Sequence, residues 1–254
     1  MDYLSKEKTY EIIEVCLLAG RIMLKNGAET YRVEDTMTRI AKAYGVEDSD
    51  SFVTPTGIIF SLEGREPTKT KLIRIIDRTT NLEKVLKVND ISRKISSGYI
   101  SLQEAYLLLK EIDKEGPTYT IWVQVVAAAI ASGCFLIMFQ GIWNDFLAAV
   151  IAGGAGFLCS VYFHRVVQIK FFAEFLASVL VGLIAFGAVF LGFGVEIDKI
   201  IIGSVMPLVP GLLITNAVRD LMAGHLVSGI SKGAEAFLTA FAIGSGIAVV
   251  FVVF

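Results

Sequence analysis

Five apolar stretches in the second half of the chain constrain its fold more than any other feature. They cover residues 121–139, 146–163, 171–192, 200–218 and 236–254. Each is close to the ~20 residues that a helix needs to cross the hydrocarbon core of a bilayer. A helix satisfies its backbone groups internally, as a lipid environment requires. The sequence therefore predicts an α-helical polytopic membrane protein with five transmembrane helices.

Charged residues divide the chain at the same place. Of the 48 Asp, Glu, Lys and Arg residues, 37 lie in residues 1–118 and 11 in residues 119–254. The hydrophobic content of 54% and the mean hydropathy of +0.65 are too high for an ordinary soluble protein. We therefore expect an N-terminal cytoplasmic α+β domain over residues 1–117, ending in a linker at 115–117, and a membrane domain over residues 118–254.

Composition also excludes several classes of function. Each half has a net charge of about −1 by count, so neither offers a basic surface for nucleic acid. The three cysteines match neither a disulfide nor a zinc pattern, and we interpret them as small buried hydrophobic residues: Cys16, Cys134 and Cys159. The sequence contains no nucleophile with a paired base, no phosphate-binding glycine loop and no metal cluster, so we expect neither an enzyme nor a cofactor.

The first half reads as alternating helices and short strands. Thr30 is the expected cap of the second helix, and Gly45 is the residue that ends it. Residues 51–64 contain Pro55 and Gly57, which suit either two short strands or one bent strand. The other expected elements are a helix over 4–25, a strand over 70–76, and helices over 81–95 and 102–112.

Two features predict the orientation in the membrane. The start MDYLSKEKTYEII has no basic segment followed by an apolar run, so we expect the first domain to remain in the cytoplasm. Short loops on that side then carry four basic residues, whereas the opposite loops carry Lys199 alone. The four are Arg165, Lys170, Arg219 and Lys232. Five crossings of the membrane then place the C-terminus outside.

The fourth apolar stretch carries the most unusual pattern, VMPLVPGLLITNAVRDLMAG. Proline removes an amide donor and crowds the preceding turn, so this helix should be kinked or broken. Freed amides and the positive end of the following half-helix can hold a substrate carboxylate. The candidate substrate-binding residues are Pro207, Pro210, Gly211, Thr215, Asn216 and Arg219. The alternative is a kink that serves packing only.

Ionisable residues near this stretch are candidates for binding a carboxylate or carrying a proton. Arg219 could pair with a substrate carboxylate through its planar fork, and Asp220 could carry a proton. A purely interfacial Arg and Asp at a helix end is an equally strong interpretation. Glu174 and Glu235 are further proton-relay candidates, although residues so near a helix end commonly lie at the headgroups. We expect both histidines, His164 and His225, at the interface.

Small residues recur at every fourth position in two of the stretches. This spacing allows helix backbones to approach closely. It favours packing within one bundle, and the alternative is that one seam receives another subunit. The seams are Ala152, Gly156 and Ser160, and Ala240, Gly244 and Ala248.

Two regions resemble the signatures of the threonine/serine exporter family. The first is NGAETYRVEDTMTRIAKAYGV followed by FVTPTGIIFSLEG, and the second is PLVPGLLITNAVRDLMAGHLVSGISKGAEA. The resemblance implies an inner-membrane carrier that exports small amino acids with the proton gradient. Some members are split into a longer chain and a short all-membrane partner, and a split member is associated with dicarboxylate export. The chain stops after its fifth crossing, so it resembles the longer component of a split system.

Two alternatives stay open. A membrane-anchored sensor or scaffold would bind a ligand or protein through its first domain. We place this below transport, because a tether needs one crossing rather than five with one broken by proline. A homo-oligomer would replace the partner subunit if the chain works without one.

Overall fold

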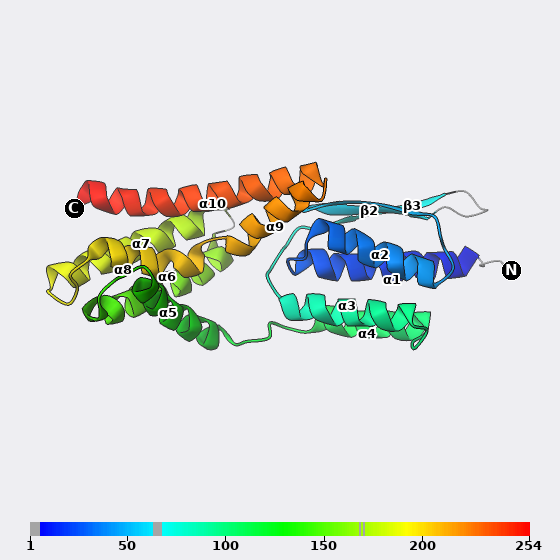
Figure 1. The fold of residues 1–254 in the computed structure, drawn as a ribbon, viewed down its shortest axis with the longest axis horizontal. Helices are drawn as coiled ribbons and strands as arrows, with labels where there is room; N and C mark the ends of the chain where they lie inside the picture. Colours follow the sequence, from blue (N-terminus) through cyan, green and yellow to red (C-terminus); the bar gives the residue numbers. More distant parts are fainter. Residues whose placement is uncertain (1–5, 63–67, 168, 170) are drawn as a thin grey trace. The chain divides into compact units, whose positions relative to one another are not determined.

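The computed structural model describes residues 6–62, 68–167, 169 and 171–254 (Figure 1). Leu4, Gly64 and Lys170, which enter the predictions above, lie outside these ranges. Contacts divide the chain into two compact units. Unit 1 comprises Met1–Thr118 and Leu212–Gly233, and unit 2 comprises Tyr119–Gly211 and Ala234–Phe254. The sequence assigned residues 212–233 to the membrane half, whereas in the structure they pack with the first 118 residues.

Unit 1 contains a sheet and two pairs of helices in three layers (Figure 1). The antiparallel sheet has the order β1-β2-β3, and its first hairpin turns at Pro55 and Thr56. Of the two alternatives for residues 51–64, the two-strand interpretation is therefore correct. The helices and strands are α1 Lys6–Lys25, α2 Thr30–Ala43, β1 Ser49–Thr54, β2 Gly57–Leu62, β3 Lys69–Arg74, α3 Leu82–Ser96 and α4 Leu102–Lys114.

Helix α1 forms the centre of unit 1, because residues 15–20 and 22–24 are buried on every side of the helix. It contacts α2, α3, α4 and the sheet, and lies between the sheet and the α3–α4 pair. Strand β2 alternates with period two, so Ile58, Phe60 and Leu62 point into this core. Burial raises the pKa of the Cys16 thiol, which identifies it as a packing residue. Cys134 is exposed, so the prediction of a buried residue there is wrong.

Unit 2 is built from apolar helices and confirms the multi-pass prediction. Among the residues that the structure describes, four helices are long and apolar enough to cross a membrane, and a broken helix pair, whose second half α9 belongs to unit 1, makes a fifth candidate span. Small residues of α6 pack against α7, since a Cβ at Gly156 would lie 2.4 Å from Val181 Cγ2. The elements of this half of the chain are α5 Ile121–Met138, η1 Trp143–Asp145, α6 Phe146–Val166, α7 Phe172–Phe190, α8 Ile197–Val205, η2 Met206–Leu208, α9 Gly211–Met222 and α10 Leu226–Val253.

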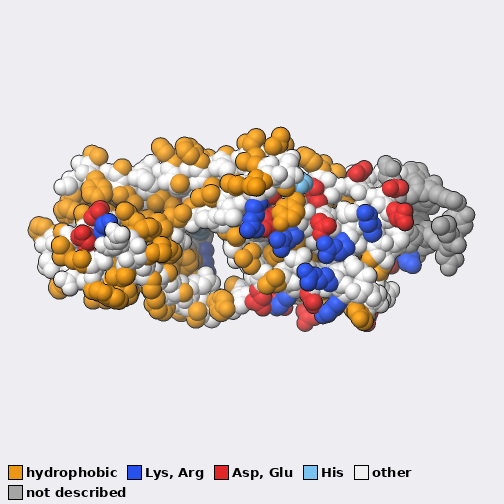
Figure 2. All heavy atoms as spheres, viewed as in Figure 1, with side chains coloured by type: hydrophobic (Ala, Val, Ile, Leu, Met, Phe, Trp, Pro, Cys, Tyr) orange, Lys and Arg blue, Asp and Glu red, His pale blue; other side chains and the backbone are white. Residues whose placement is uncertain are grey.

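The two small-residue seams differ in their surroundings. Ala152, Gly156 and Ser160 are buried on α6, which confirms packing within the bundle for the first seam. The second seam is exposed, and a Cβ at Gly244 would meet no atom within 4 Å. Helix α10 packs on α7 through a neighbouring face instead, where Gly246 approaches the carbonyl oxygen of Phe175. Figure 2 shows the charged side chains gathered over unit 1 and hydrophobic ones over unit 2.

Candidate functional site

The helix break predicted in the fourth stretch is present. Helix α8 passes into the 3-10 turn η2, which contains Pro207 and ends at Leu208. Pro210 follows outside any helix, and α9 begins at Gly211. Proline cannot donate the amide hydrogen bond that would continue the helix, so the interruption follows directly from the sequence.

Helix α9 and the first turns of α10, up to Gly233, then form a tight hairpin within unit 1. Gly224 has a φ of +87°, which the short turn between the helices requires. A Cβ at Gly229 would lie 2.5 Å from Leu221 Cγ and 3.0 Å from the Ala217 oxygen, so only glycine permits this approach. One turn further along α10, Lys232 reaches back to α9.

Asp220 is the centre of a buried polar cluster in this hairpin. The residue is fully buried, and its Oδ1 accepts a hydrogen bond from the Thr30 amide at 2.9 Å. Its Oδ2 accepts one from the Thr30 hydroxyl at 2.8 Å and one from Lys232 Nζ at 2.7 Å. The Lys232 side chain is only 4% exposed. Removing both charges from water is costly, so each depends strongly on the other.

This arrangement corrects the predicted start of α2. Thr30 is not the cap but the first helical residue, and the capping position belongs to Glu29, whose side chain makes no capping hydrogen bond. The first amides of a helix have no partner within it and attract negative charge. Asp220, 190 residues away in the chain, supplies that partner.

Arg219 and Asn216 also contact the turn between α1 and α2. Arg219 Nη1 lies 2.5 Å from Glu29 Oε1, and Arg32 Nε lies 3.0 Å from Glu29 Oε2. Asn216 Nδ2 donates a hydrogen bond to the Gly27 oxygen at 2.9 Å. The predicted carboxylate partner, Arg219, thus already binds a carboxylate of its own chain.

A third set of contacts joins the hairpin to β1 and α2. Glu34 accepts a hydrogen bond from the Val53 amide at 3.0 Å and lies 3.8 Å from His225 Nδ1. Ser228 donates to the Val53 oxygen at 2.9 Å. Burial raises the pKa of Glu34, the Val53 hydrogen bond and His225 oppose this rise, and the charge of Asp220 adds to it.

The other predicted site residues lie elsewhere. Thr215 is on the exposed side of α9. Glu174, in the first turn of α7 in unit 2, lies 3.3 Å from His164 Nε2 through its Oε1. Its Oε2 is buried and makes no hydrogen bond to any residue that the structure describes. In the part of the chain that the structure describes, no group of His, Cys, Asp and Glu is arranged to hold a metal ion.

Sequence reasoning did not identify three residues that contact Asp220, Arg219 or their partners. They are Glu29, Arg32 and Lys232. Residues 26–37 are dense in charge, but charges around a helix start are usually solvated or capping. Lys232 was counted as a loop residue. A signal was available in the small residues around it, Gly229 and Gly233, because such residues allow close helix packing and a lysine among them faces the neighbouring helix.

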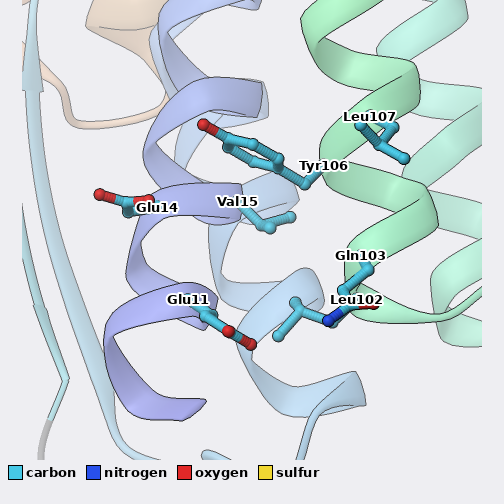
Figure 3. A pocket seen from close by; sticks show the side chains of 7 residues that line it. All are labelled: Glu11, Glu14, Val15, Leu102, Gln103, Tyr106 and Leu107. Atoms are coloured by element: carbon cyan, nitrogen blue, oxygen red, sulfur yellow. The ribbon is translucent and has the colours of Figure 1, made fainter. Parts of the chain in front are cut away.

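A separate hollow lies between α1 and α4, with a volume of about 360 Å³ (Figure 3). Val15 and the Tyr106 ring lie within it, whereas Glu14 points away from α4. Glu14 pairs with Lys71 of β3 at 3.3 Å. Glu11 and Gln103 also line the hollow, which shares no residue with the polar cluster around Asp220.

Comparison with known proteins supplies the context for this cluster. A family model described as "Putative threonine/serine exporter" matches residues 14–254. A protein of Klebsiella aerogenes named "Probable succinate transporter subunit YjjP" is 26% identical, and the match covers 92% of this chain and 90% of that protein. No solved structure gives a significant match.

Other relatives are longer. The "Probable threonine/serine exporter" of Mycobacterium tuberculosis is 21% identical over 91% of this chain but only 44% of its own length. The "Threonine/serine exporter" of Corynebacterium glutamicum is 22% identical over 94% of this chain and 50% of its own length. The chain thus spans about half of these two relatives.

Proposed function

Because the chain belongs to the threonine/serine exporter family, which is a family of transporters and not of enzymes, we propose that it exports small amino acids or small carboxylates. The proton gradient drives the export, and the chain works as an antiporter in the inner membrane. The observation that carries this proposal is the proline-broken helix pair followed at once by the Asn216–Asp220 polar groups. Broken helices in transporters commonly hold substrate and coupling ions.

Substrate binding is assigned to the break and to the polar residues behind it. Pro207 and Pro210 have no amide hydrogen to donate, so the helix is interrupted before Gly211, and Arg219 supplies a guanidinium for a carboxylate. Thr215 and Asn216 add neutral hydrogen-bonding groups on α9. In the structure Arg219 already holds Glu29, which supports its ability to bind a carboxylate.

Proton coupling is assigned to Asp220, with Glu174 as a second carrier. A proton on Asp220 removes the charge that Lys232 and the first amide of α2 hold. The link between the α9–α10 hairpin and α2 then weakens, so protonation and movement are coupled. The support for Glu174 is its one buried oxygen, which makes no hydrogen bond in the described part of the chain.

Flux measurements on three variants test this assignment. Arg219→Lys should weaken transport, because an ammonium cannot reproduce the planar fork. Pro210→Ala should restore an amide and reduce binding. The double variant Asp220→Asn/Lys232→Met removes the proton site together with its buried counter-charge, so it should fold and bind substrate but not accumulate it against a gradient. Near-normal values for all three at matched membrane expression would reject the site.

A partner subunit and the orientation are part of the same proposal. The word "subunit" in the name of the Klebsiella relative supports a short all-membrane partner. Vesicles with the lone chain should show little counterflow, and full activity would favour a homo-oligomer. A cytoplasm-dependent reporter fused at Phe254 should be inactive if the N-terminus is cytoplasmic and five helices cross the membrane.

A further inference from the structure

One carboxylate in unit 1 is shared by two guanidinium groups. Glu29 Oε1 contacts Arg219 at 2.5 Å, and Glu29 Oε2 contacts Arg32 at 3.0 Å. The Glu29 side chain is 10% exposed, whereas those of Arg32 and Arg219 are 40% and 54% exposed. The carboxylate is thus enclosed between two cations whose outer sides reach solvent.

Both guanidinium groups keep unused donors. A guanidinium offers five N–H donors in a planar fork, and its strongest contact with a carboxylate is bidentate. Arg219 uses Nη1 for Glu29, and Arg32 uses Nε, with a long contact of 3.5 Å from Nη2 to the Tyr31 hydroxyl. Within the described residues, neither arginine grips Glu29 with both arms of its fork.

The neighbouring acids do not neutralise this pair of arginines. Asp220 is held by Thr30 and Lys232, and Glu34 by the Val53 amide and His225. One carboxylate therefore faces two full positive charges. The excess positive charge favours the binding of a second anion at the two guanidinium groups.

The start of α2 does not depend on the contacts of the Glu29 carboxylate with Arg32 and Arg219. Glu29 occupies the capping position of α2 but makes no capping hydrogen bond, and Asp220 holds the first amide of that helix instead. Its carboxylate can therefore exchange without unfolding the start of α2.

We propose that Arg32 and Arg219 form a carboxylate-binding pair, that Glu29 occupies it in this structure, and that a ligand carboxylate competes with Glu29 for it. This deepens the proposed function by adding Arg32 as a binding residue and Glu29 as an internal competitor, and it rests on the carboxylate role of Arg219. The ligand is a small carboxylate, either a dicarboxylate or an amino acid.

Equilibrium binding to the full chain in lipid nanodiscs tests the proposal, with labelled succinate and labelled threonine as separate probes. Glu29→Gln keeps the shape but loses the competing charge, so affinity should rise several-fold. Arg32→Gln should lower affinity about tenfold, the usual effect of losing one charge-assisted hydrogen bond. Arg39→Gln is the matched control, because Arg39 lies on the same helix and pairs with exposed Asp35. The affinity of the Arg39→Gln variant for both labelled probes should equal that of the unmodified chain.

The outcomes separate this proposal from the broader one. If Arg219→Gln abolishes binding while Glu29→Gln and Arg32→Gln match Arg39→Gln, the pair is rejected and the Arg219 site stands. If Arg219→Gln also binds normally, both are rejected. Absence of binding by every variant, including Glu29→Gln, rejects the pair. Should Glu29→Gln fail to fold, the comparison of Arg32→Gln with Arg39→Gln decides alone, and equal affinities overturn the pair.

Discussion

Among the described residues, each compact unit buries one aspartate completely, and the two aspartates are held by different partners. In unit 2, Asp145 accepts hydrogen bonds from the amides of Val195 and Glu196 at 2.6 and 2.9 Å, just before α8 begins. In unit 1, Asp220 accepts from the amide and hydroxyl of Thr30 and from the ammonium group of Lys232.

The difference lies in the counter-charge. Oriented backbone amides hold Asp145, and such a cap stays fixed as long as the loop does. Asp220 adds a second buried ion, whose removal from water is costly, so the pair contributes less to stability than its short distance suggests. One proton on Asp220 would leave Lys232 buried without a counter-charge. Backbone amides alone therefore hold Asp145, whereas the hold on Asp220 depends in part on the charge of Lys232.

The same substitution at the two sites should have unequal effects, and the largest is expected at Asp220. Asp220→Asn leaves the Lys232 ammonium buried without a counter-charge, which should lower the free energy of unfolding by about 3–5 kcal/mol. Adding Lys232→Met to this variant should recover most of the loss. Denaturant unfolding in detergent measures both, and a double variant no better than the single would contradict the buried-pair interpretation.

Two glycines of α10 in unit 2 should respond differently to the same substitution by alanine. A Cβ at Gly246 would lie 2.5 Å from the Phe175 oxygen, so Gly246→Ala should cost roughly 1–3 kcal/mol through overpacking. Gly244→Ala meets open space and should leave the lone chain as stable as before. Thermal unfolding of the two variants checks this. If the exposed seam receives a subunit, Gly244→Ala should instead weaken co-purification of the partner.

Asp145→Asn should have a smaller effect than Asp220→Asn. The amide oxygen of asparagine can still accept one of the two backbone hydrogen bonds, and no buried cation is left behind. We expect a loss of about 1–2 kcal/mol, the usual result of leaving one buried donor unsatisfied. An equal or larger loss than at Asp220, measured by the same unfolding assay, would show that the two aspartates are equivalent.

The smallest expected effect is a pH dependence from Glu34. Its pKa is raised above the ordinary value of 4.5, mainly by burial, so the folded state holds this proton more tightly than the unfolded state. Its contribution to stability is therefore fully present below about pH 4.5 and is lost as pH rises through the raised pKa. Glu34→Gln should flatten this part of the melting-temperature profile, with Glu47→Gln as the exposed control. A profile unchanged in Glu34→Gln would count against the assignment.

Local features of the fold could be predicted from the sequence because their causes are local. The apolar stretches locate the candidate spans by length alone. Pro207 and Pro210 interrupt the fourth, since a missing amide breaks a helix in any context. Gly45 ends α2 with a positive φ, as its position after the last apolar residue indicated.

The site could be predicted only in part. Asn216, Arg219 and Asp220 stood out as polar groups after a broken apolar run, and the structure places them in one cluster. Their partners could not be identified, because an amphipathic pattern shows which face is polar but not which distant segment it meets. Lys232 looked like a loop cation, and Glu29 looked like a solvated carboxylate at a helix start.

Local sequence patterns are enough to locate the elements: how many apolar spans the chain can form, where the fourth one breaks and where the charged half ends. Which residues contact one another depends on the tertiary structure. It joined Thr30 to Asp220 across 190 positions, and it buried one small-residue seam while exposing the other, although both have the same spacing. The physical reason is that helix breaks and periodicity arise within a few residues, whereas burial depends on which surfaces meet in three dimensions.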